Sequence, residues 1–371
     1  MGLTILAFIT SFLVVIFFTP SLIKVAELKN LTDTPDALRK LHKRSVPTIG
    51  GIIIYAGTLF SYALWLPTDD ASDFKFIVTT TLLMFFVGVK DDIIGTAPMK
   101  KLAAHVLCTL VIVLMANIRI KSLHGIFGVY EIPYWASIFL SLFTMIVIIN
   151  AFNLIDGVDG LAAGIGFIAA MAFGTWFLLV KDLVMACMAF ALAGSLLAFL
   201  YYNFSPAKIF MGDSGSLTIG LIMSILAIKL IEFDRVSMIY PLAQLTKPVV
   251  AIAFLIYPLV DTMRIFIYRA FNGLSPFNAD RNHIHHRLQK LGLSHRQTSS
   301  LLYSATILIV AVALLTKDLK PTFALLIVVG VAVLLCLIPF YLMKEKLPLV
   351  KPFENEGNEI KIENINEDQI N

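Results

Sequence analysis

The sequence predicts an all-α, polytopic membrane protein with about eleven transmembrane helices. Of its 371 residues, 58% are hydrophobic and only 15% are charged, and the mean hydropathy is +0.85. A soluble domain carries about 25% charged residues and roughly 45–50% apolar ones, so water would solvate this chain poorly. The apolar residues also form long runs separated by polar segments, a pattern typical of membrane-spanning helices that alternate with loops.

Eleven apolar runs approach the length of about 20 residues that a helix needs to cross a bilayer. The first, from Leu3 to Phe18, has no preceding basic residue and no small-residue cleavage site, so we expect a retained helix rather than a signal peptide. The run at 76–90 is short and holds three threonines, so its limits are soft. The expected spans are 2–21, 48–66, 76–90, 102–118, 134–152, 161–180, 183–202, 215–231, 247–268, 300–316 and 321–343.

The distribution of positive charge predicts the orientation. With the N-terminus outside and the C-terminus inside (N-out/C-in), the cytoplasmic loops hold most of the 29 lysines and arginines, as the positive-inside rule requires. We therefore expect residues 1–343 to form a single transmembrane domain whose polar loops lie on the cytoplasmic face. Residues 344–371 are rich in Glu, Asn and Ile without helical periodicity, which indicates a disordered cytoplasmic tail.

Composition argues against several classes of protein. The net charge of +4, without a cluster of basic and aromatic residues, argues against a nucleic-acid partner. Cys108, Cys187 and Cys336 are far apart and each lies inside an apolar run, which argues against both a disulfide framework and a thiolate metal site. We see no internal repeat, which counts against a transporter built from inverted halves.

Acidic residues gather at the cytoplasmic end of the third run, in Gly88-Val-Lys-Asp91-Asp92-Ile-Ile-Gly95. Adjacent carboxylates at a membrane boundary repel each other and lose solvation, and a bound cation would compensate for both effects. An ordinary acidic helix end in the headgroup region explains this segment equally well when it is taken alone.

A second polar segment, Asn150-Ala-Phe-Asn153-Leu-Ile-Asp156-Gly-Val-Asp159-Gly160, follows the fifth run. Asn153 and Asp156 are three residues apart and would share one face of a helix. Glycines between and after the carboxylates let the backbone leave the helix and approach a ligand. Amides and carboxylates in this place suit a hydroxylated, charged ligand, and a helix C-cap followed by a polar turn is the alternative.

The third segment, Asn203-Phe-Ser-Pro-Ala-Lys-Ile-Phe210-Met-Gly-Asp213-Ser-Gly-Ser, places Asp213 where the next helix is expected to begin. A carboxylate flanked by glycines at a helix N-terminus suits a phosphate and its metal ion, although a simple N-cap is the alternative. Phe210 could stack on a nucleobase while Asn203 forms hydrogen bonds with its edge.

The fourth segment, Asp280-Arg281-Asn-His283-Ile-His285-His286-Arg287, lies in the longest cytoplasmic loop. Its histidines and arginines are suited to clamp a phosphate or pyrophosphate. A zinc site is the rival interpretation, although the flanking arginines would oppose a dication, and a solvated surface loop is a third.

A basic segment, Arg39-Lys40-Leu-His42-Lys43-Arg44, precedes the second run. It is either a topology signal that binds anionic lipid or part of a substrate site, with Lys43 as the candidate residue.

In this order and on one face, these segments resemble the polyprenyl-phosphate N-acetylhexosamine-1-phosphate transferase superfamily over roughly residues 30–300. The stretches GVKDD, NAFNLIDGVDGLAAG and FMGDSGSL carry the resemblance. The segment from Arg39 to Gly51 and the loop around His283 are similar to UDP-GlcNAc:undecaprenyl-phosphate GlcNAc-1-phosphate transferases. Those bacterial enzymes start O-antigen, enterobacterial common antigen or teichoic acid linkage units. At Gly95 the chain departs from many relatives, which carry Asp, Lys or another polar residue there.

The resemblance implies an Mg²⁺-dependent enzyme of the bacterial cytoplasmic (inner) membrane, with Mn²⁺ as a substitute ion. It would transfer N-acetylhexosamine-1-phosphate, most simply GlcNAc-1-phosphate, from a UDP-N-acetylhexosamine to undecaprenyl phosphate in the lipid bilayer, releasing UMP. Asp213 and Asp92 would hold the metal, and Asp91 (the favoured proton acceptor), Asp92 and Asp159 would be catalytic. The implied substrate-binding residues are Asn153, Asp156, Asn203, Phe210, His283, His285, His286, Arg287 and Lys43.

Three alternatives stay open at this point. The phospho-MurNAc-pentapeptide transferase of peptidoglycan synthesis is the closest rival, although it usually has a Pro-Leu-His-His-His type of loop. An ion-coupled transporter would place charges near span midpoints, whereas the acidic residues here lie at span ends. A non-catalytic assembly partner would tolerate loss of the aspartates. We expect direct transfer without a phospho-enzyme; the exact sugar, the glycan and the oligomeric state are undetermined, and a homodimer is one option.

Overall fold

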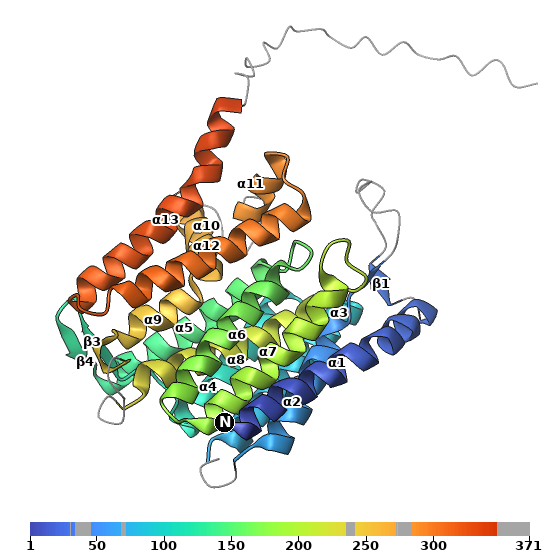
Figure 1. Cartoon of the computed structure of the whole chain (residues 1–371), viewed down its shortest axis with the longest axis horizontal. Helices are drawn as coiled ribbons and strands as arrows, with labels where there is room; N and C mark the ends of the chain where they lie inside the picture. Colours follow the sequence, from blue (N-terminus) through green and yellow to red (C-terminus); the bar gives the residue numbers. More distant parts are fainter. Residues whose placement is uncertain are drawn as a thin grey trace, which may run out of the picture.

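The computed structural model describes residues 1–29, 31–33, 46–67, 72–234, 242–271, 273 and 283–346, and these are mostly helical. Their helices pack as a bundle (Figure 1). The α-helices are α1 (Gly2–Leu28), α2 (Gly50–Trp65), α3 (Phe74–Ile94), α4 (Pro98–Leu110), α5 (Tyr134–Leu154), α6 (Leu161–Leu179), α7 (Leu183–Asn203), α8 (Gly212–Glu232), α9 (Lys247–Phe254), α10 (Ile256–Phe271), α11 (Ile284–Lys290), α12 (His295–Leu315) and α13 (Pro321–Lys346). A π-helical turn, η2 (Val111–Met115), continues α4, and a 3₁₀ turn, η4 (Leu242–Gln244), precedes α9.

Two small antiparallel sheets correct the all-α expectation. Strand β1 (Thr32–Asp33) pairs with β2 (Val46–Pro47), and β3 (Ser122–Ile126) pairs with β4 (Val129–Glu131). The β3–β4 turn has positive φ angles at Phe127 and Gly128, a conformation that glycine adopts without strain. Strands of two to five residues are too short to show an alternating apolar pattern, so the sequence did not reveal them.

Eight helices of the described residues are long and apolar enough to cross a membrane, or nine if α9 and α10 count as one broken span. Helix α2 falls below that standard because it has only 16 residues. Helix α3 carries Lys75, Lys90, Asp91 and Asp92 along its 21 residues, and it is also outside this set. A multi-pass membrane protein is therefore confirmed, whereas length and composition alone do not confirm the count of eleven.

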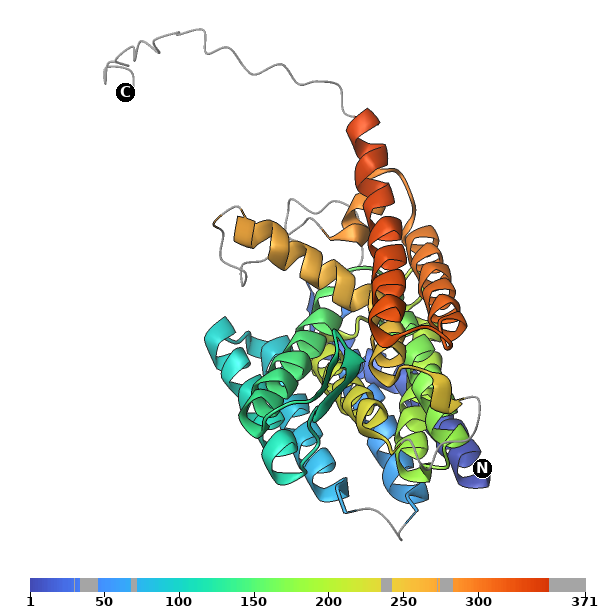
Figure 2. The same cartoon turned by 90° about the vertical axis from the view of Figure 1, so that its left-hand side faces the viewer.

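The prediction of one continuous span at 247–268 was wrong. Helix α9 ends at Phe254, and α10 leaves it at an angle of 83° (Figure 2). Pro258 explains the break, because a proline has no N–H group to bond with the carbonyl of Phe254 four residues earlier, and its ring clashes there. The break directs α10 toward one end of the bundle, where it contacts α13 and lies near α11.

Helix α8 forms the buried centre of the bundle and contacts α2, α3, α5, α6 and α9. Glycines allow its first turn to be approached closely. A Cβ atom on Gly51 of α2 would lie 2.0 Å from the backbone nitrogen of Gly215, and one on Gly88 of α3 would lie 2.4 Å from Cα of Ser214. Three helix backbones therefore meet around the start of α8.

The chain crosses from one end of this bundle to the other. Met1 lies at the end opposite to α11 and to the end of α13 (Figures 1 and 2). We call the end that carries α11 the site end, because α3, α5 and α7 finish there and α4, α6, α8 and α12 begin there. Helix α13 extends to Lys346, and the remainder of the predicted tail lies outside the described residues, as does Lys43.

Candidate active site

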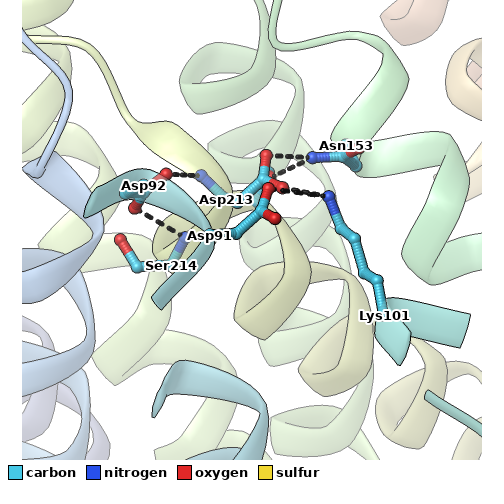
Figure 3. A network of polar contacts seen from close by, with 7 residues as sticks. Asp91, Asp92, Lys101, Asn153, Asp213 and Ser214 are labelled. Carbon is cyan, nitrogen blue, oxygen red and sulfur yellow. Dashed lines mark hydrogen bonds and ion pairs between the residues drawn. The ribbon is translucent and has the colours of Figure 1, made fainter. Parts of the chain in front are cut away.

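A polar network at the site end joins Asp91 of α3, Lys101 of α4, Asn153 of α5 and Asp213 of α8 (Figure 3). The Lys101 ammonium forms an ion pair with Oδ2 of Asp213 and lies 3.5 Å from Oδ2 of Asp91. Nδ2 of Asn153 donates to Oδ1 of Asp213 at 2.7 Å and to Oγ of Ser216 at 3.0 Å. Three helices, α3, α4 and α5, thus aim polar side chains at the carboxylate of α8.

The carboxyl groups of Asp91 and Asp213 also contact each other directly. Two carboxylates in direct contact require a shared proton or a cation between them. Lys101 supplies one positive charge, and each of the three side chains is about one-fifth exposed. The network is therefore reachable from solvent and still short of positive charge.

Asp92, the neighbour of Asp91, has a different environment. Its Oδ1 accepts a hydrogen bond from the backbone amide of Asp213 at 2.6 Å, and its Oδ2 accepts one from the amide of Ser214 at 3.0 Å (Figure 3). These amides belong to the first turn of α8, where backbone N–H groups have no partner within the helix. Asp92 therefore caps α8 from a neighbouring helix and holds the Asp213 backbone in place.

The residues before α8 are held by backbone contacts with the start of α2. The amides of Gly50 and Gly51 donate to the carbonyl oxygens of Phe210 at 2.9 Å and Met211 at 2.7 Å. Gly212 has φ +70, and a Cβ atom there would lie 2.1 Å from the carbonyl oxygen of Thr48, so a side chain at this position would be excluded. The glycines of the FMGDSG stretch are thus needed for the turn that presents Asp213.

Asp156 lies in the turn between α5 and α6, close to the same group of acids. Loss of solvation raises the pKa of its carboxyl well above the ordinary value, and the charges of Asp213 and Asp92 raise it further. The backbone amide of Gly212 opposes this shift by donating to the carboxylate. Asp156 thus belongs to the acidic cluster, although it lies past the end of α5 and not on the helical face that the sequence suggested.

The donor set suits a hard divalent cation. In the described part of the chain, no three His, Cys, Asp or Glu side chains are already arranged to hold a metal ion. Mg²⁺, however, is usually held by one or two carboxylates together with phosphates of a substrate and waters. Asp91 and Asp213 offer such carboxylates, and the surrounding excess of acids fits a dication.

Asp159 and Asn203 face the protein interior. The Asp159 carboxylate accepts from the amide of Ala207 at 3.2 Å and lies 3.4 Å from Nδ1 of His295. Oδ1 of Asn203 accepts from the amide of Gly160 at 3.0 Å, and its Nδ2 donates to the carbonyl oxygen of Ile209 at 2.8 Å. Both side chains therefore tie the loops of the site end together, and the roles expected for them in catalysis and uridine binding stay predictions.

His285 of the fourth segment reaches the acidic cluster at Gly157. A Cβ atom on Gly157, next to Asp156, would lie 3.1 Å from Nε2 of His285. Burial lowers the pKa of His285 to about 3, so this ring is neutral at physiological pH. His286 and Arg287 are half-buried beside it, and the guanidinium of Arg287 lies 5.1 Å from the ring centre of Phe340.

A large apolar cavity extends from the β3–β4 hairpin, at the end opposite to the site end, to the middle of α10. It has a volume of about 700 Å³ and is lined by side chains of β3, α5, α8, α9, α10 and α13, with Arg264 among them. Apart from Arg264 its lining is almost wholly apolar, with Phe143, Ile252 and Met263 as examples. Such a cavity accommodates hydrocarbon rather than a sugar nucleotide.

Two residues of the site were missed in the sequence. Lys101 follows the acidic motif by ten residues, in a helix with ordinary composition. Asp261 lies in α10, and its Oδ2 is 2.9 Å from Nδ1 of His283. Each is a charged residue inside or beside an apolar run, and this was the one signal that could have identified them. Such a charge costs free energy in a membrane protein unless it is paired.

Known proteins are similar to this chain in sequence. Residues 74–231, which span α3 to α8 and hold all five aspartates named above from Asp91 to Asp213, match the family model described as "Glycosyl transferase family 4". The bundle and the polar network therefore define a membrane glycosyl transferase.

Three relatives indicate which family within this class the chain resembles. The chain is 30% identical over 306 residues to "Undecaprenyl-phosphate alpha-N-acetylglucosaminyl 1-phosphate transferase" of Escherichia coli O157:H7, covering 79% of this chain and 78% of the relative. It is 31% identical to the "Probable undecaprenyl-phosphate N-acetylglucosaminyl 1-phosphate transferase" of Bacillus subtilis, with 81% of each chain covered. It is 33% identical to the "Decaprenyl-phosphate N-acetylglucosaminephosphotransferase" of Mycolicibacterium smegmatis, over 71% of this chain and 70% of the relative. The chain belongs to the polyprenyl-phosphate N-acetylglucosamine-1-phosphate transferase family.

Proposed function

We propose that this protein transfers N-acetylglucosamine-1-phosphate from UDP-N-acetylglucosamine to undecaprenyl phosphate and releases UMP. The observation that carries the proposal is the single network of Asp91, Lys101 and Asp213 at one end of an apolar helix bundle. A reaction between two phosphates brings anions together, and positioned charges and a cation lower its barrier. The lipid-pyrophosphate-linked sugar would then start a cell-surface polysaccharide.

The apolar cavity supports a lipid acceptor. The cavity has a volume of about 700 Å³, and three of its lining helices, α5, α10 and α13, also carry exposed apolar side chains, such as Phe139, Ile267 and Leu334, so a polyprenyl chain could enter from the membrane. Arg264 is a charged group on that lining, near the middle of α10. An acceptor with a hydrocarbon tail and an anionic head therefore matches both parts of the cavity.

Direct transfer accounts for the chemistry without a covalent enzyme intermediate. A phosphate oxygen of the acceptor attacks the β-phosphorus of the donor, and the bond from that phosphorus to the bridging oxygen breaks. UMP leaves with the bridging oxygen. Asp91 would accept the proton of the acceptor phosphate, and Lys101, at 3.5 Å from Asp91, would neutralise negative charge that gathers between the two phosphates.

Mg²⁺, or Mn²⁺ in its place, is proposed as the cofactor of this site. When bound, the ion would supply charge neutralisation on the phosphates of the donor. Asp213 would hold it, since this carboxylate lies at the centre of the network. Asp92 is the second expected ligand, and it would have to release a backbone amide of α8 in order to reach the ion.

The remaining expected site residues are proposed as contacts of the donor. Asp159 is retained as a proposed catalytic residue, and Asn203 and Lys43 as proposed substrate contacts, with Lys43 outside the described residues. The other proposed contacts of the UDP-sugar are Asn153, Asp156, Phe210, His283, His285, His286 and Arg287.

We also propose eleven membrane crossings with the N-terminus outside, in the bacterial cytoplasmic (inner) membrane. The eight long apolar helices, together with α2, α3 and the broken pair α9–α10, give eleven crossings. An odd number of crossings agrees with the positions of Met1 and the end of α13 at opposite ends of the bundle. The basic loops would then face the cytoplasm, where UDP-sugars are present.

A transfer assay with purified protein tests the function. Radiolabelled UDP-GlcNAc, UDP-GalNAc and UDP-MurNAc-pentapeptide are each supplied with undecaprenyl phosphate and Mg²⁺, and lipid-linked product and UMP are measured. We expect product from UDP-GlcNAc. Absence of product from every donor would overturn the proposal, and product from the pentapeptide donor alone would assign the protein to peptidoglycan synthesis.

A further inference from the structure

Asp261 is a fully buried carboxylate on α10 that lies outside all the acidic motifs of the sequence. Its Oδ2 lies 2.9 Å from Nδ1 of His283, and its Oδ1 accepts the backbone amide of Ile284 at 3.0 Å. The guanidinium of Arg264, one turn along α10, lies 3.5 Å from Oδ1. Burying a carboxylate costs free energy unless such partners stabilise it. The Asp261 cluster is therefore part of the protein interior and not a surface contact.

The contacts of Asp261 determine how α11 is held. This helix has only seven residues, and its own hydrogen bonds are too few to fix its position. The carboxylate binds the His283 side chain just before the helix and the amide of its first residue, Ile284. Asp261 therefore anchors both the backbone and a ring at the start of α11.

His285 connects Asp261 and His283 with the turn that carries Asp156. Nδ1 of His285 lies 4.0 Å from Oδ2 of Asp261 and 3.4 Å from the hydroxyl of Tyr257, and its ring stacks on that of His283 with centres 5.3 Å apart. On its other side, Nε2 lies against Gly157 and has no hydrogen-bond partner among the described residues. A buried ring nitrogen without a partner, beside Asp156, is available to a ligand.

Helix α10 separates this polar side from the lipid side. Leu259, Met263 and Ile267 line the large apolar cavity, whereas Tyr257 and Asp261 face α11. Arg264 links the two sides, because it lines the cavity and lies 3.5 Å from Oδ1 of Asp261. Asp261→Asn keeps an oxygen that can accept from Arg264, so this substitution should reach the histidines without altering the surface that would hold the lipid.

We propose that Asp261 is a positioning residue of the donor site, acting through His283 and His285 to hold α11 against the Asp156–Gly157 turn. This inference rests on the proposed function, because the donor is taken to be a UDP-sugar bound between the acidic cluster and the histidines. Asp261 itself does not touch the substrate. Its loss weakens binding of the donor and leaves binding of the lipid acceptor unchanged.

The test compares Asp261→Asn with Asp73→Asn. Asp73 forms an ion pair with Lys229 just before the start of α3, at the end of that helix away from Asp91. We expect Asp261→Asn to raise KM for UDP-GlcNAc, and its Kd measured by calorimetry, by about tenfold, the effect of losing one hydrogen bond to a charged group. KM for undecaprenyl phosphate should stay within about twofold in both variants, and Asp73→Asn should leave both KM values unchanged.

A second variant separates positioning from folding. His283→Gln removes the same contact from its other end, and it should raise the donor KM by a similar factor even if Asp261→Asn folds poorly. The double variant should resemble either single variant, because both changes break one interaction. An unchanged donor KM and Kd in both variants, or equal losses for donor and acceptor, would overturn the assignment. Wild-type protein that neither binds nor uses UDP-GlcNAc would instead overturn the proposed function.

Discussion

The carboxylate of Asp92 accepts a hydrogen bond from the backbone amide of Asp213 at 2.6 Å. The second acid of the GVKDD stretch therefore fixes the backbone of Asp213, the central acid of the site. Asp91, on the next position of α3, instead faces the Asp213 side chain and Lys101. One turn of a helix thus carries two adjacent acids with separate tasks. One supports the backbone of α8, and the other takes part in the charged network.

This separation predicts different effects for Asp92→Asn and Asp91→Asn. In Asp92→Asn the side-chain amide faces one of the two α8 amides and leaves it unpaired, which should lower the free energy of unfolding by about 1–3 kcal/mol. Asp91→Asn should leave stability nearly unchanged and lower kcat. Thermal unfolding in detergent and initial rates distinguish the two. If Asp92→Asn kept its Tm and lost Mg²⁺ affinity, Asp92 would be a metal ligand, as the resemblance implied.

Lys101 should be required for turnover. Lys101→Met removes the ammonium group that lies between Asp91 and Asp213 and should lower kcat/KM by about tenfold to a hundredfold, since hydrogen bonds to charged groups contribute about 1.5–3 kcal/mol. Lys100→Met is the matched control, because Lys100 is the adjacent, exposed residue and should tolerate the change. Equal rates for the two variants would remove Lys101 from the site.

The close meeting of α3 and α8 predicts a packing effect. Gly88→Ala would place Cβ 2.4 Å from the Cα atom of Ser214, and the backbones must separate. Overpacking of this kind costs about 1–3 kcal/mol, and it should also displace Asp213. Gly330→Ala in α13 is the control, since its Cβ would have no neighbour within 4 Å. We expect a lower Tm and a lower kcat only for Gly88→Ala; unchanged values would show that α3 can move away from α8.

Much of the fold could be predicted because a bilayer requires long apolar helices with internally bonded backbones. The span expected at 134–152 became α5, Tyr134–Leu154, and the expected helix start near Asp213 became Gly212. The break before α10 depends on a single proline, Pro258, in an otherwise apolar run. The family also followed from the order of the polar segments, and the relatives confirm it.

The partners within the site could not be predicted, because they come from distant parts of the chain. Lys101 and Asp213 are 112 residues apart, and Asp261 and His283 are 22 apart with α10 and a loop between them. Motifs show which residues are unusual in a membrane helix, but not which neighbour compensates for each charge. Asp92 illustrates the limit, since its sequence context is the same as that of Asp91 and its partners are backbone amides.

The proposed topology predicts which loops an impermeant thiol reagent can reach. Lys290→Cys, exposed at the end of α11, should be labelled only after the cells are permeabilised. Tyr130→Cys, in the β3–β4 hairpin where Tyr130 is 68% exposed, should be labelled in intact spheroplasts. Of the three native cysteines, Cys108 and Cys187 are buried and Cys336 is partly buried inside the apolar helix α13, so the background should be low. Labelling of Lys290→Cys in intact spheroplasts would reverse the orientation.

Metal dependence is the last expectation, and it centres on Asp213. Treatment with EDTA should abolish transfer, and Mg²⁺ or Mn²⁺ should restore it, because the Asp213 network has more carboxylates than cations. Asp213→Asn keeps the size of the side chain and an acceptor for Asn153, but it removes the charge that a dication needs. We expect turnover to fall by at least about a hundredfold and not to recover at high Mg²⁺. Lys100→Met should keep the wild-type Mg²⁺ dependence. Asp213→Asn with normal Mg²⁺-dependent turnover would show that the ion, if required, is held by other residues.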